Sequence, residues 1–334
     1  MTHHASTFVV RDPADLIALV PGFFGFHPER SIVMLSVGRG GPPCHARIDL
    51  PTDRAEHAAL VDHLAGVAVR NGTSALTFLL YTDDAPLADA FSRVARRRMR
   101  QVHLPVMGVF RVDAQRWWRI DGPPGSGEDG TPYNVSVHPF TAQTVVDGTV
   151  VLDSRDELAA TLAAIPAEVE RVAGHAEERA AAMSGRRSDL VLEGRWVRRR
   201  VREFLDEGRP LGAADVARLL VDLGVDLEVR DVAWAEMERA NARRHVDLWR
   251  DVVRRSPDHL VAAPAALLGF AAWLSGNGAL AWCAVDRCQA ASPGYSMAGL
   301  LTQALAGGLP PSAWRPMPHS ILTLFQDERS WAGS

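Results

Sequence analysis

The stretch DPADLIALVPGFFGFHPERSIVMLSV, Asp12–Val37, combines a helix start, a turn and an apolar strand, and we expect the rest of the chain to pack around it. Asp12 stands where a helix N-cap is expected, and Pro13 occupies the first helical position. Pro21 disfavours helix at the residue before it, so we expect the helix to end there. The segment 31–37 is apolar on both faces, which is typical of a central strand in a covered sheet.

The rest of the first half alternates between strand patterns and helix patterns. The segment 44–50 alternates apolar and polar residues and follows a Gly/Pro-rich turn, so it should pair with 31–37 as a hairpin. The order of elements predicts an α/β domain over 1–153, with a mixed β-sheet and flanking helices rather than a pure Rossmann fold. We expect further strands at 75–82, 106–112 and 116–120, two edge strands at 135–137 and 144–152, and helices at 52–71 and 85–101.

The pattern changes period near Ser154, where Ser154-Arg155-Asp156-Glu157 has the signature of a capping box. We expect an all-α region over 154–334, in which 166–188 is either a linker or a solvated helix. Leu268–Pro293 resembles one tetratricopeptide (TPR-like) helical hairpin, in which small residues allow close helix crossing. The expected helices are 155–165, 167–183, 189–206, 213–222, 226–255 with a break left open, 259–275, 278–291 and 296–306; the hairpin positions are Leu268-Gly269, Gly276, Ala281, Val285, Cys288 and Pro293.

Composition excludes several classes of function. All 36 basic side chains are Arg, because the chain has no Lys. The usual pyridoxal phosphate enzymes and P-loop ATP binding are therefore excluded, since both require a lysine. The formal net charge of −4 makes nucleic acid an unlikely partner, because a general nucleic-acid binder needs a basic surface.

The three cysteines, Cys44, Cys283 and Cys288, are too few and too irregular for a disulfide framework, so we expect a reducing compartment. We see no signal peptide at the start of the chain. The most apolar run, Leu260–Leu274, is too short to span a bilayer and reads as a buried helix. These observations predict a cytoplasmic protein with no membrane partner.

Polar residues follow the strands of the expected sheet and should meet at one of its edges, where open α/β sheets bind ligands. Carboxylates with a histidine could hold Mg²⁺ or Mn²⁺, for which Asp49 and Asp83 are the weak candidates, or could act as an acid–base pair. The alternative is that these residues cap helices and end strands, with Asp83 as the cap of the next helix. The candidate ligand-binding residues are His27, Glu29, Asp49, Asp83, Asp84, Arg111 and Asp113.

Arginines also cluster on the expected helix 189–206, whose apolar side carries Trp196, Val197 and Phe204. Such a cluster can bind an acidic partner or nucleic acid, or it can be a solvated helix face paired with Glu and Asp. The solvated face is the more common case, because surface ion pairs are abundant and weak. The cluster comprises Arg195, Arg198, Arg199, Arg200 and Arg202.

The segment PADLIALVPGFFGFHPERSIVMLSV, residues 13–37, resembles the opening motif of the actinobacterial proteins of domain of unknown function 4192. The resemblance covers most of the chain, and the GFHPE turn is its most specific part. It implies a bacterial cytoplasmic protein, but the family name carries no activity and no catalytic residue. Other segments that agree are Arg47–Pro51, Arg116-Trp117-Trp118, Gly130-Thr131-Pro132 and Leu268–Trp314.

Two functions are consistent with these features. The first is a non-catalytic binding or scaffold protein, whose helical half forms the surface for a protein partner. The alternative is a small-molecule enzyme, with or without a divalent metal, whose site lies at the His27–Asp49–Asp83 edge of the sheet. A deep pocket at this edge would favour the enzyme, whereas an exposed groove on the helices would favour the binding protein.

Overall fold

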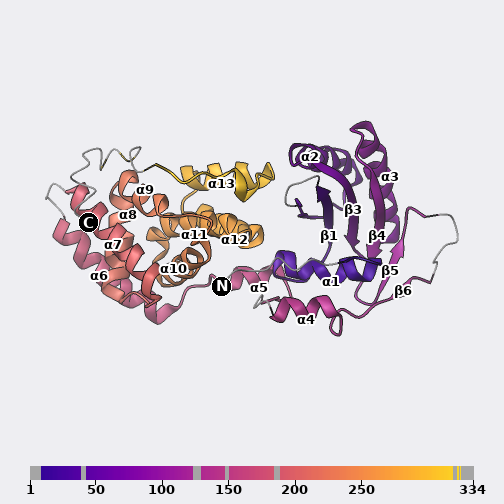
Figure 1. The fold of residues 1–334 in the computed structure, drawn as a ribbon. Helices are drawn as coiled ribbons and strands as arrows, with labels where there is room; N and C mark the ends of the chain where they lie inside the picture. Colours follow the sequence, from indigo (N-terminus) through magenta and orange to yellow (C-terminus); the bar gives the residue numbers. More distant parts are fainter. Residues whose placement is uncertain are drawn as a thin grey trace. The chain divides into compact units, whose positions relative to one another are not determined.

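A computed structural model describes residues 9–38, 43–122, 129–146, 150–183 and 189–318, together with Leu322 and Leu324. The chain forms two compact units, Met1–Glu157 and Leu158–Ser334. The first contains the sheet and the second is helical, as the labels in Figure 1 show. Helix α5 (Arg155–Ala160) spans the boundary between the units. The expected fold class, a mixed α/β sheet followed by an all-α region, is confirmed.

The first unit is built on one six-stranded sheet with the order β2-β1-β3-β4-β5-β6. β1 lies between β2 and β3 and is antiparallel to both, whereas β3 and β4 are parallel. β5 returns antiparallel to β4, as the sequence predicts, and β6 pairs with β5. The strands are β1 (Ser31–Gly38), β2 (Ala46–Asp49), β3 (Thr73–Tyr81), β4 (Val106–Val112), β5 (Arg116–Arg119) and β6 (Thr131–Pro132).

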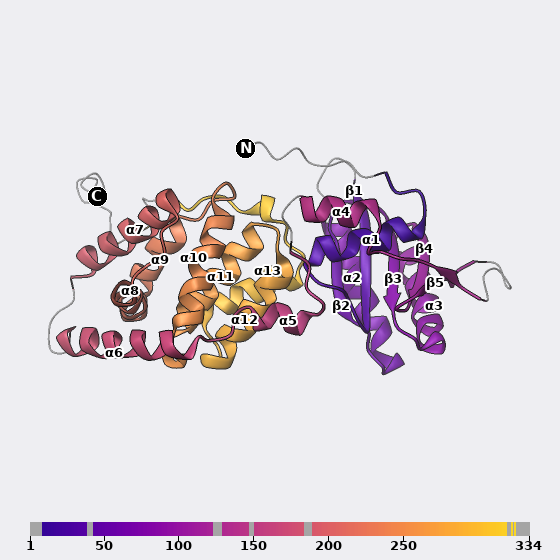
Figure 2. The ribbon, with the colours of Figure 1, turned by 90° about the horizontal axis from the view of Figure 1, so that it is seen from below.

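Helices cover both faces of this sheet, because its central strands are apolar on both sides. Ile32 of β1 packs in one core with residues of α2 and α3. Val33, the next residue, packs on the opposite face with Ile17 and Val20 of α1. Figure 2 shows α1 crossing the strands, with α4 beside it. The helices are α1 (Pro13–Phe24), α2 (His57–Arg70), α3 (Ala85–Gln101) and α4 (Pro139–Val146), with a short 3-10 turn at Arg54–Glu56.

Helix α1 begins as predicted but ends later than predicted. The Asp12 side chain accepts a hydrogen bond from Asp15 N, and the Asp15 side chain accepts one from Asp12 N, which completes a capping box. The helix continues through Pro21 to Phe24, so the expected end before Pro21 is wrong. Gly25, at φ +78°, stops the helix instead, and its N–H donates to the Pro21 carbonyl at 2.8 Å.

The expected edge strand at 135–137 is a turn, and the expected strand 144–152 is wrong over residues 144–146, while Leu152 forms an isolated parallel bridge with Phe26. Residues 139–146 form helix α4, and residues 147–149 lie outside the described chain. His138 Nδ1 accepts a hydrogen bond from Phe140 N at 3.2 Å and so satisfies a donor of the first turn. Thr144 packs against Gly22 of α1. This tertiary contact overrides the strand preference of the β-branched residues.

The second unit consists of helices, and the expected helix 226–255 is divided in two between residues 236 and 241. α6 packs against α8 and buries Val172 and Ala176, so 166–183 is a helix rather than a linker, while 184–188 lies outside the described chain. The helices are α6 (Pro166–Met183), α7 (Leu190–Glu207), α8 (Ala213–Val225), α9 (Leu227–Ala235), α10 (Ala242–Arg255), α11 (Ala262–Leu274), α12 (Gly278–Ala291) and α13 (Ser296–Ala306), with 3-10 turns at Asp258–Leu260 and Pro311–Ala313.

Helices α11 and α12 form the hairpin that the TPR-like positions predict. Gly269 allows the close approach of two helices to α11, because a Cβ atom there would lie 3.4 Å from the Ala281 carbonyl oxygen of α12 and 2.8 Å from Leu301 Cδ2 of α13. Gly276, at φ +89°, makes the turn between the two helices. Among the described residues, no helix is both long enough and apolar enough to cross a membrane.

Candidate functional site

The sheet register brings the ends of several strands to one edge. Ser31, at the start of β1, pairs with Asp49 at the end of β2 and with Tyr81 at the end of β3. Tyr81 in turn pairs with Val112 at the end of β4. The expected ligand residues that follow these strands therefore lie along the same edge: Asp49, Asp83, Asp84 and Asp113.

The acidic side chains at this edge serve local structure. Asp84, rather than the expected Asp83, caps α3 by accepting a hydrogen bond from Leu87 N at 2.8 Å. Asp113 accepts from Arg116 N at 2.7 Å and so closes the turn into β5. Asp84 is the cap because it is the residue directly before the first turn of the helix.

The remaining edge candidates contact their neighbours through the side chains of Asp49 and Arg111 and through the backbone of His27, Glu29 and Asp83. Asp49 is exposed and pairs with Arg47 at 2.7 Å. The Glu29 carbonyl oxygen accepts from Arg47 Nη2 at 3.4 Å, and the His27 N–H donates to the Leu152 carbonyl at 3.0 Å. Arg111 stacks over the Trp118 ring, 3.5 Å from its centre, and its Nη1 lies 3.5 Å from the Asp83 carbonyl oxygen. The described residues contain no group of three or more His, Cys, Asp or Glu side chains placed to hold a metal.

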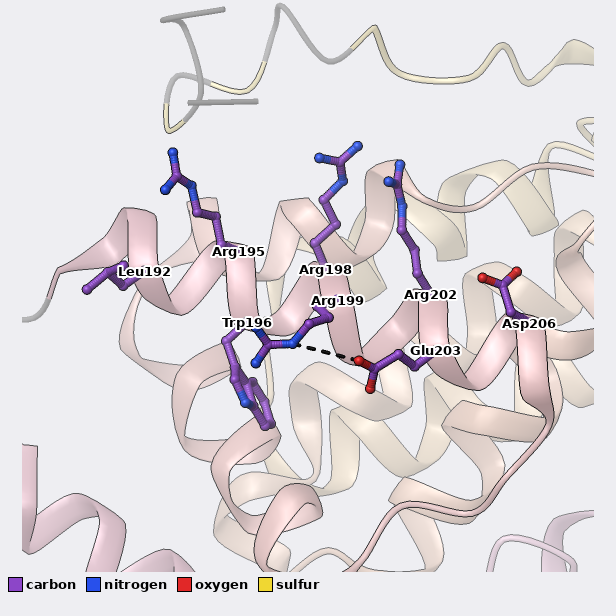
Figure 3. Close-up of a pocket in the computed structure, with 8 residues that line it drawn as sticks. All are labelled: Leu192, Arg195, Trp196, Arg198, Arg199, Arg202, Glu203 and Asp206. Carbon is purple, nitrogen blue, oxygen red and sulfur yellow. Dashed lines mark ion pairs between the residues drawn. The ribbon is translucent and has the colours of Figure 1, made fainter. Parts of the chain in front are cut away.

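A groove lies along α7 in the helical unit. Asp189 caps the start of helix α7, where its side chain accepts hydrogen bonds from Val191 N and Leu192 N, and Gly208, at φ +69°, caps the end. The groove has a volume of about 430 Å³. Figure 3 shows Arg195, Arg198 and Arg202 pointing to one side of the helix. The lining residues are Leu192, Arg195, Trp196, Arg198, Arg199, Arg202, Glu203 and Asp206.

Two of these arginines are positioned by one buried carboxylate. Glu236, directly after α9, binds Arg198 Nε at 3.0 Å and Arg202 Nε at 2.7 Å. The Glu236 carbonyl oxygen accepts from Asn241 Nδ2 at 2.8 Å, which fixes the residue between α9 and α10. Burial lowers the pKa of Arg198, although Glu236 opposes this effect. Because Glu236 is shared, its single charge is divided between two guanidinium groups.

The rest of the groove is more exposed. The Arg199 side chain is 56% exposed, and its ion pair with Glu203 is long, at 3.8 Å. Leu192, at 57% exposure, adds an apolar surface at the start of the groove. Four guanidinium groups line the groove together with the carboxylates of Glu203 and Asp206. With Glu236, which binds Arg198 and Arg202, the arginines exceed the carboxylates by one. Exposed guanidinium groups bind carboxylates and phosphates in bidentate geometry, so this surface suits an anionic ligand.

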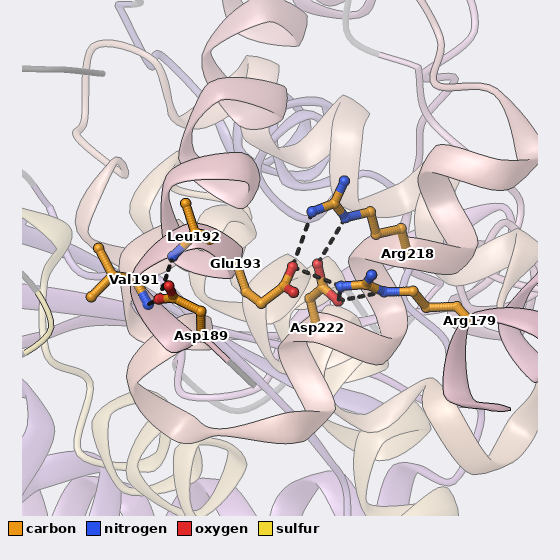
Figure 4. A network of polar contacts seen from close by, with 7 residues as sticks. All are labelled: Arg179, Asp189, Val191, Leu192, Glu193, Arg218 and Asp222. Atoms are coloured by element: carbon orange, nitrogen blue, oxygen red, sulfur yellow. Dashed lines mark hydrogen bonds and ion pairs between the residues drawn. The ribbon is translucent and has the colours of Figure 1, made fainter. Parts of the chain in front are cut away.

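Trp196 connects the groove with a polar network on its inner side. Trp196 lines the groove, and the Arg218 guanidinium lies over its ring at 4.2 Å from the centre. Arg218 of α8 also binds Glu193 at 3.0 Å and Asp222 at 3.2 Å. Arg179 of α6 binds the same two carboxylates, at 2.7 and 2.8 Å. Figure 4 shows both arginines reaching toward the carboxylate pair.

The two carboxylates of this network have opposite pKa shifts. The Asp222 side chain is fully buried, and this burial, with Glu193 beside it, raises the pKa of Asp222 to about 6. Burial also disfavours the charged form of Glu193, but its hydrogen bonds with Asp222, Arg218 and Arg179 prevail and lower the pKa of Glu193. The pair therefore takes up its first proton on Asp222 as the pH falls.

The sequence indicated the arginine cluster but not its partners. Arg218 and Asp222 have the four-residue spacing of a helical ion pair, which was the only local signal of the network. Glu193 and Arg179 join it from other helices, and Glu236 reaches Arg198 from a position 38 residues away. Contacts at such separations depend on how the helices pack, so periodicity alone does not reveal them.

The fold and the groove define a two-unit protein in which a mixed α/β sheet is followed by a helical unit with an arginine-lined surface. The model of one family, described as Domain of unknown function (DUF4192), matches residues 13–312. The chain belongs to this family, as its opening motif predicts. No curated protein and no solved structure matches the chain.

Proposed function

We propose that the protein is a non-catalytic binding or scaffold protein, and that the α7 groove binds an extended acidic segment of a partner protein. The observation that carries this proposal is the arrangement of four arginines along one open groove, two of them oriented by the buried Glu236. Preorganised guanidinium groups lose little rotamer freedom when a carboxylate binds, which favours affinity.

The dimensions and chemistry of the groove fit a short peptide. Arg195 and Arg202 are seven residues apart, so their backbones are separated by roughly 10 Å along the helix. An extended chain covers this distance with about three residues, because each adds roughly 3.3 Å. A glutamate-rich segment with one apolar residue could therefore reach the arginines and also cover Leu192. Charge complementarity would set the rate and specificity of this association.

The alternative, an enzyme at the sheet edge, has less support. Asp84 and Asp113 are engaged in a helix cap and a turn, and Asp49 is held by Arg47. General acid–base catalysis would require such groups to face a substrate. Edge carboxylates that hold the backbone are better explained as structural groups.

A cytoplasmic location belongs to the same proposal. Cys44, Cys283 and Cys288, all in the described part of the chain, form no disulfide bond, and the last two are buried. Cysteines that are not paired in disulfides support a reducing compartment.

A peptide titration tests the proposal. The probe is a fluorescein-labelled glutamate-rich peptide with a central leucine, and the reference is its glutamine counterpart. We expect the double variant Arg195→Ala/Arg199→Ala to bind the acidic peptide about ten-fold more weakly, since two surface ion pairs contribute about 0.7 kcal/mol each. The control Arg171→Ala/Arg239→Ala removes two exposed arginines elsewhere in the helical unit. Equal affinities of the two double variants would refute the proposal.

A further inference from the structure

A second arginine surface lies in the sheet unit, on the outer side of α3. The inner side of this helix is apolar and packs on the sheet through Phe91, Ala95 and Met99. Arginines three, four and seven residues apart share the opposite side, and all of them are exposed. We call this surface the α3 arginine stripe; it comprises Arg93, Arg96, Arg97 and Arg100.

A buried carboxylate holds the stripe to the neighbouring strand. The Asp121 side chain is fully buried and pairs with both Arg96 and Arg119 of β5. Arg119 Nη2 also donates to the Met107 carbonyl at 3.0 Å. Asp121 thus fixes two guanidinium groups beside each other, which extends the positive surface from α3 onto the sheet.

Most of this positive charge has no neutralising partner among the residues that the structure describes. In the described part of the chain, no carboxylate pairs with Arg93, Arg97 or Arg100, and Arg98 turns away to Asp62 at 3.5 Å. Asp89, one turn before Arg93, is the acidic residue on the same side of the helix. Positive charge therefore accumulates here although the whole chain carries −4. Like charges on one helix side destabilise it slightly, and the helix dipole favours only the arginines of the last turn, so helix stability does not explain Arg93.

Apolar side chains border the stripe at its C-terminal end. Val102, the residue after α3, is 42% exposed, and Met107, whose backbone is held by Arg119, is 60% exposed. A basic surface with an apolar margin matches an amphipathic acidic protein segment. Binding of single-stranded nucleic acid would instead call for aromatic rings on which bases stack, and the stripe contains none.

We infer that the α3 arginine stripe is a second interaction surface, which binds an acidic amphipathic helix of a partner protein. The stripe is a straight row on one helix, so a partner helix with carboxylates three and four residues apart presents matching charges. One apolar residue at the end of such a helix would contact Val102 and Met107. Because α3 and α7 belong to different units, the chain would have one surface for an acidic ligand in each unit.

The test measures binding of a fluorescein-labelled helical peptide with glutamates at this spacing and a terminal leucine. The full chain is compared with Arg93→Ala/Arg97→Ala/Arg100→Ala, which keeps the Arg96–Asp121–Arg119 anchor. The control, Arg171→Ala/Arg209→Ala/Arg239→Ala, removes the same charge from the helical unit. We expect the stripe variant alone to weaken binding, by at least about ten-fold. The helical peptide should bind Arg195→Ala/Arg199→Ala within about two-fold of the unaltered chain.

The outcomes separate this inference from the function proposed for α7. An unchanged affinity of the stripe variant for the helical peptide would overturn the inference. The function proposed for α7 is tested separately, by the effect of Arg195→Ala/Arg199→Ala on binding of the extended peptide. A single-stranded oligonucleotide of matched charge is titrated in parallel. If only the oligonucleotide depends on the stripe, the surface is a nucleic-acid site and the inference is wrong. Circular dichroism of the variant checks that α3 remains folded.

Discussion

The Arg218 guanidinium lies 4.2 Å from the centre of the Trp196 ring, and this contact joins the α7 groove to the buried carboxylate pair beneath it. The same guanidinium group binds Glu193 and Asp222. One side chain therefore stabilises a wall of the groove and neutralises buried charge. Changes in the network should affect the stability of the helical unit, and through Trp196 they should reach the groove.

The first prediction concerns the pH dependence of stability. Asp222 has a pKa of about 6 in the folded chain, whereas an unfolded aspartate titrates near 3.9. The folded state therefore binds a proton that the unfolded state has already lost. The contribution of Asp222 to the free energy of unfolding is fully present below about pH 4 and is lost as the pH rises through about 6. Asp222 should therefore contribute to a decrease in melting temperature as the pH is raised from 5 to 7.5.

The variant Asp222→Asn checks this prediction, because asparagine does not titrate. We expect its melting temperature to change less between these two pH values than that of the unaltered chain, as measured by circular dichroism. Asp215→Asn, on the more exposed side of the same helix, serves as the control and should keep the original slope. Parallel pH profiles for Asp222→Asn and the unaltered chain would show that Asp222 does not carry the effect.

The second prediction concerns the charge balance of the network. Arg179→Met removes one of the two cations that face the fully buried Asp222. An uncompensated buried charge costs about 3–5 kcal/mol of unfolding free energy, which urea unfolding at pH 7 can measure. Arg171→Met alters an exposed arginine on the same helix, and its effect should stay within about 0.5 kcal/mol. Similar losses in the two variants would mean that the network contributes little.

The third prediction concerns the carboxylate that orients the groove arginines. Glu236→Gln leaves Arg198 buried without its anionic partner, so we expect a loss of stability of about 3 kcal/mol. Arg202 should also lose its fixed orientation, and affinity for the acidic peptide should fall. Glu238→Gln changes an exposed glutamate two residues later and is the matched control. Unfolding in urea and the peptide titration give the two readouts.

The fourth prediction concerns the helix crossing at Gly269. Gly269→Val would place methyl groups against Leu301 and the Ala281 carbonyl oxygen, and we expect it to cost about 1–3 kcal/mol. Gly174→Val is the control, because a Cβ atom at Gly174 meets no atom within 4 Å. Both positions are helical, so the difference in unfolding free energy isolates the packing. A loss at Gly269 no larger than that at Gly174 would contradict the close crossing.

Patterns that act within one element were sufficient to predict most of the fold. Ile32 and Val33 face opposite cores, as expected of a strand apolar on both sides. The N-cap at Asp12 and the hairpin around Gly276 follow from local backbone requirements. The misplaced strand at Thr144 had a suitable composition, but contact with α1 selected a helix.

The candidate site was less predictable, because its groups meet only after the helices pack. The sequence predicts the arginine cluster on α7, as either a binding surface or a solvated helix face. Periodicity could not show that Arg198 would be buried on Glu236, or that Glu193 and Asp222 would meet. The sheet-edge candidates were placed along one edge by topology, but strand direction alone does not show which carboxylates are already engaged in caps and turns.

The central claim is that the α7 groove binds an acidic segment, and site-specific photo-crosslinking tests it most directly. A benzoylphenylalanine is placed at Leu192 in the groove, or at Leu300 of α13 as a control, since both side chains are similarly exposed. We predict that the glutamate-rich probe crosslinks at position 192 and not at position 300, and that Arg195→Ala/Arg199→Ala or high salt suppresses the product. Equal crosslinking at both positions, or crosslinking at 192 that the arginine substitutions do not reduce, would contradict the claim.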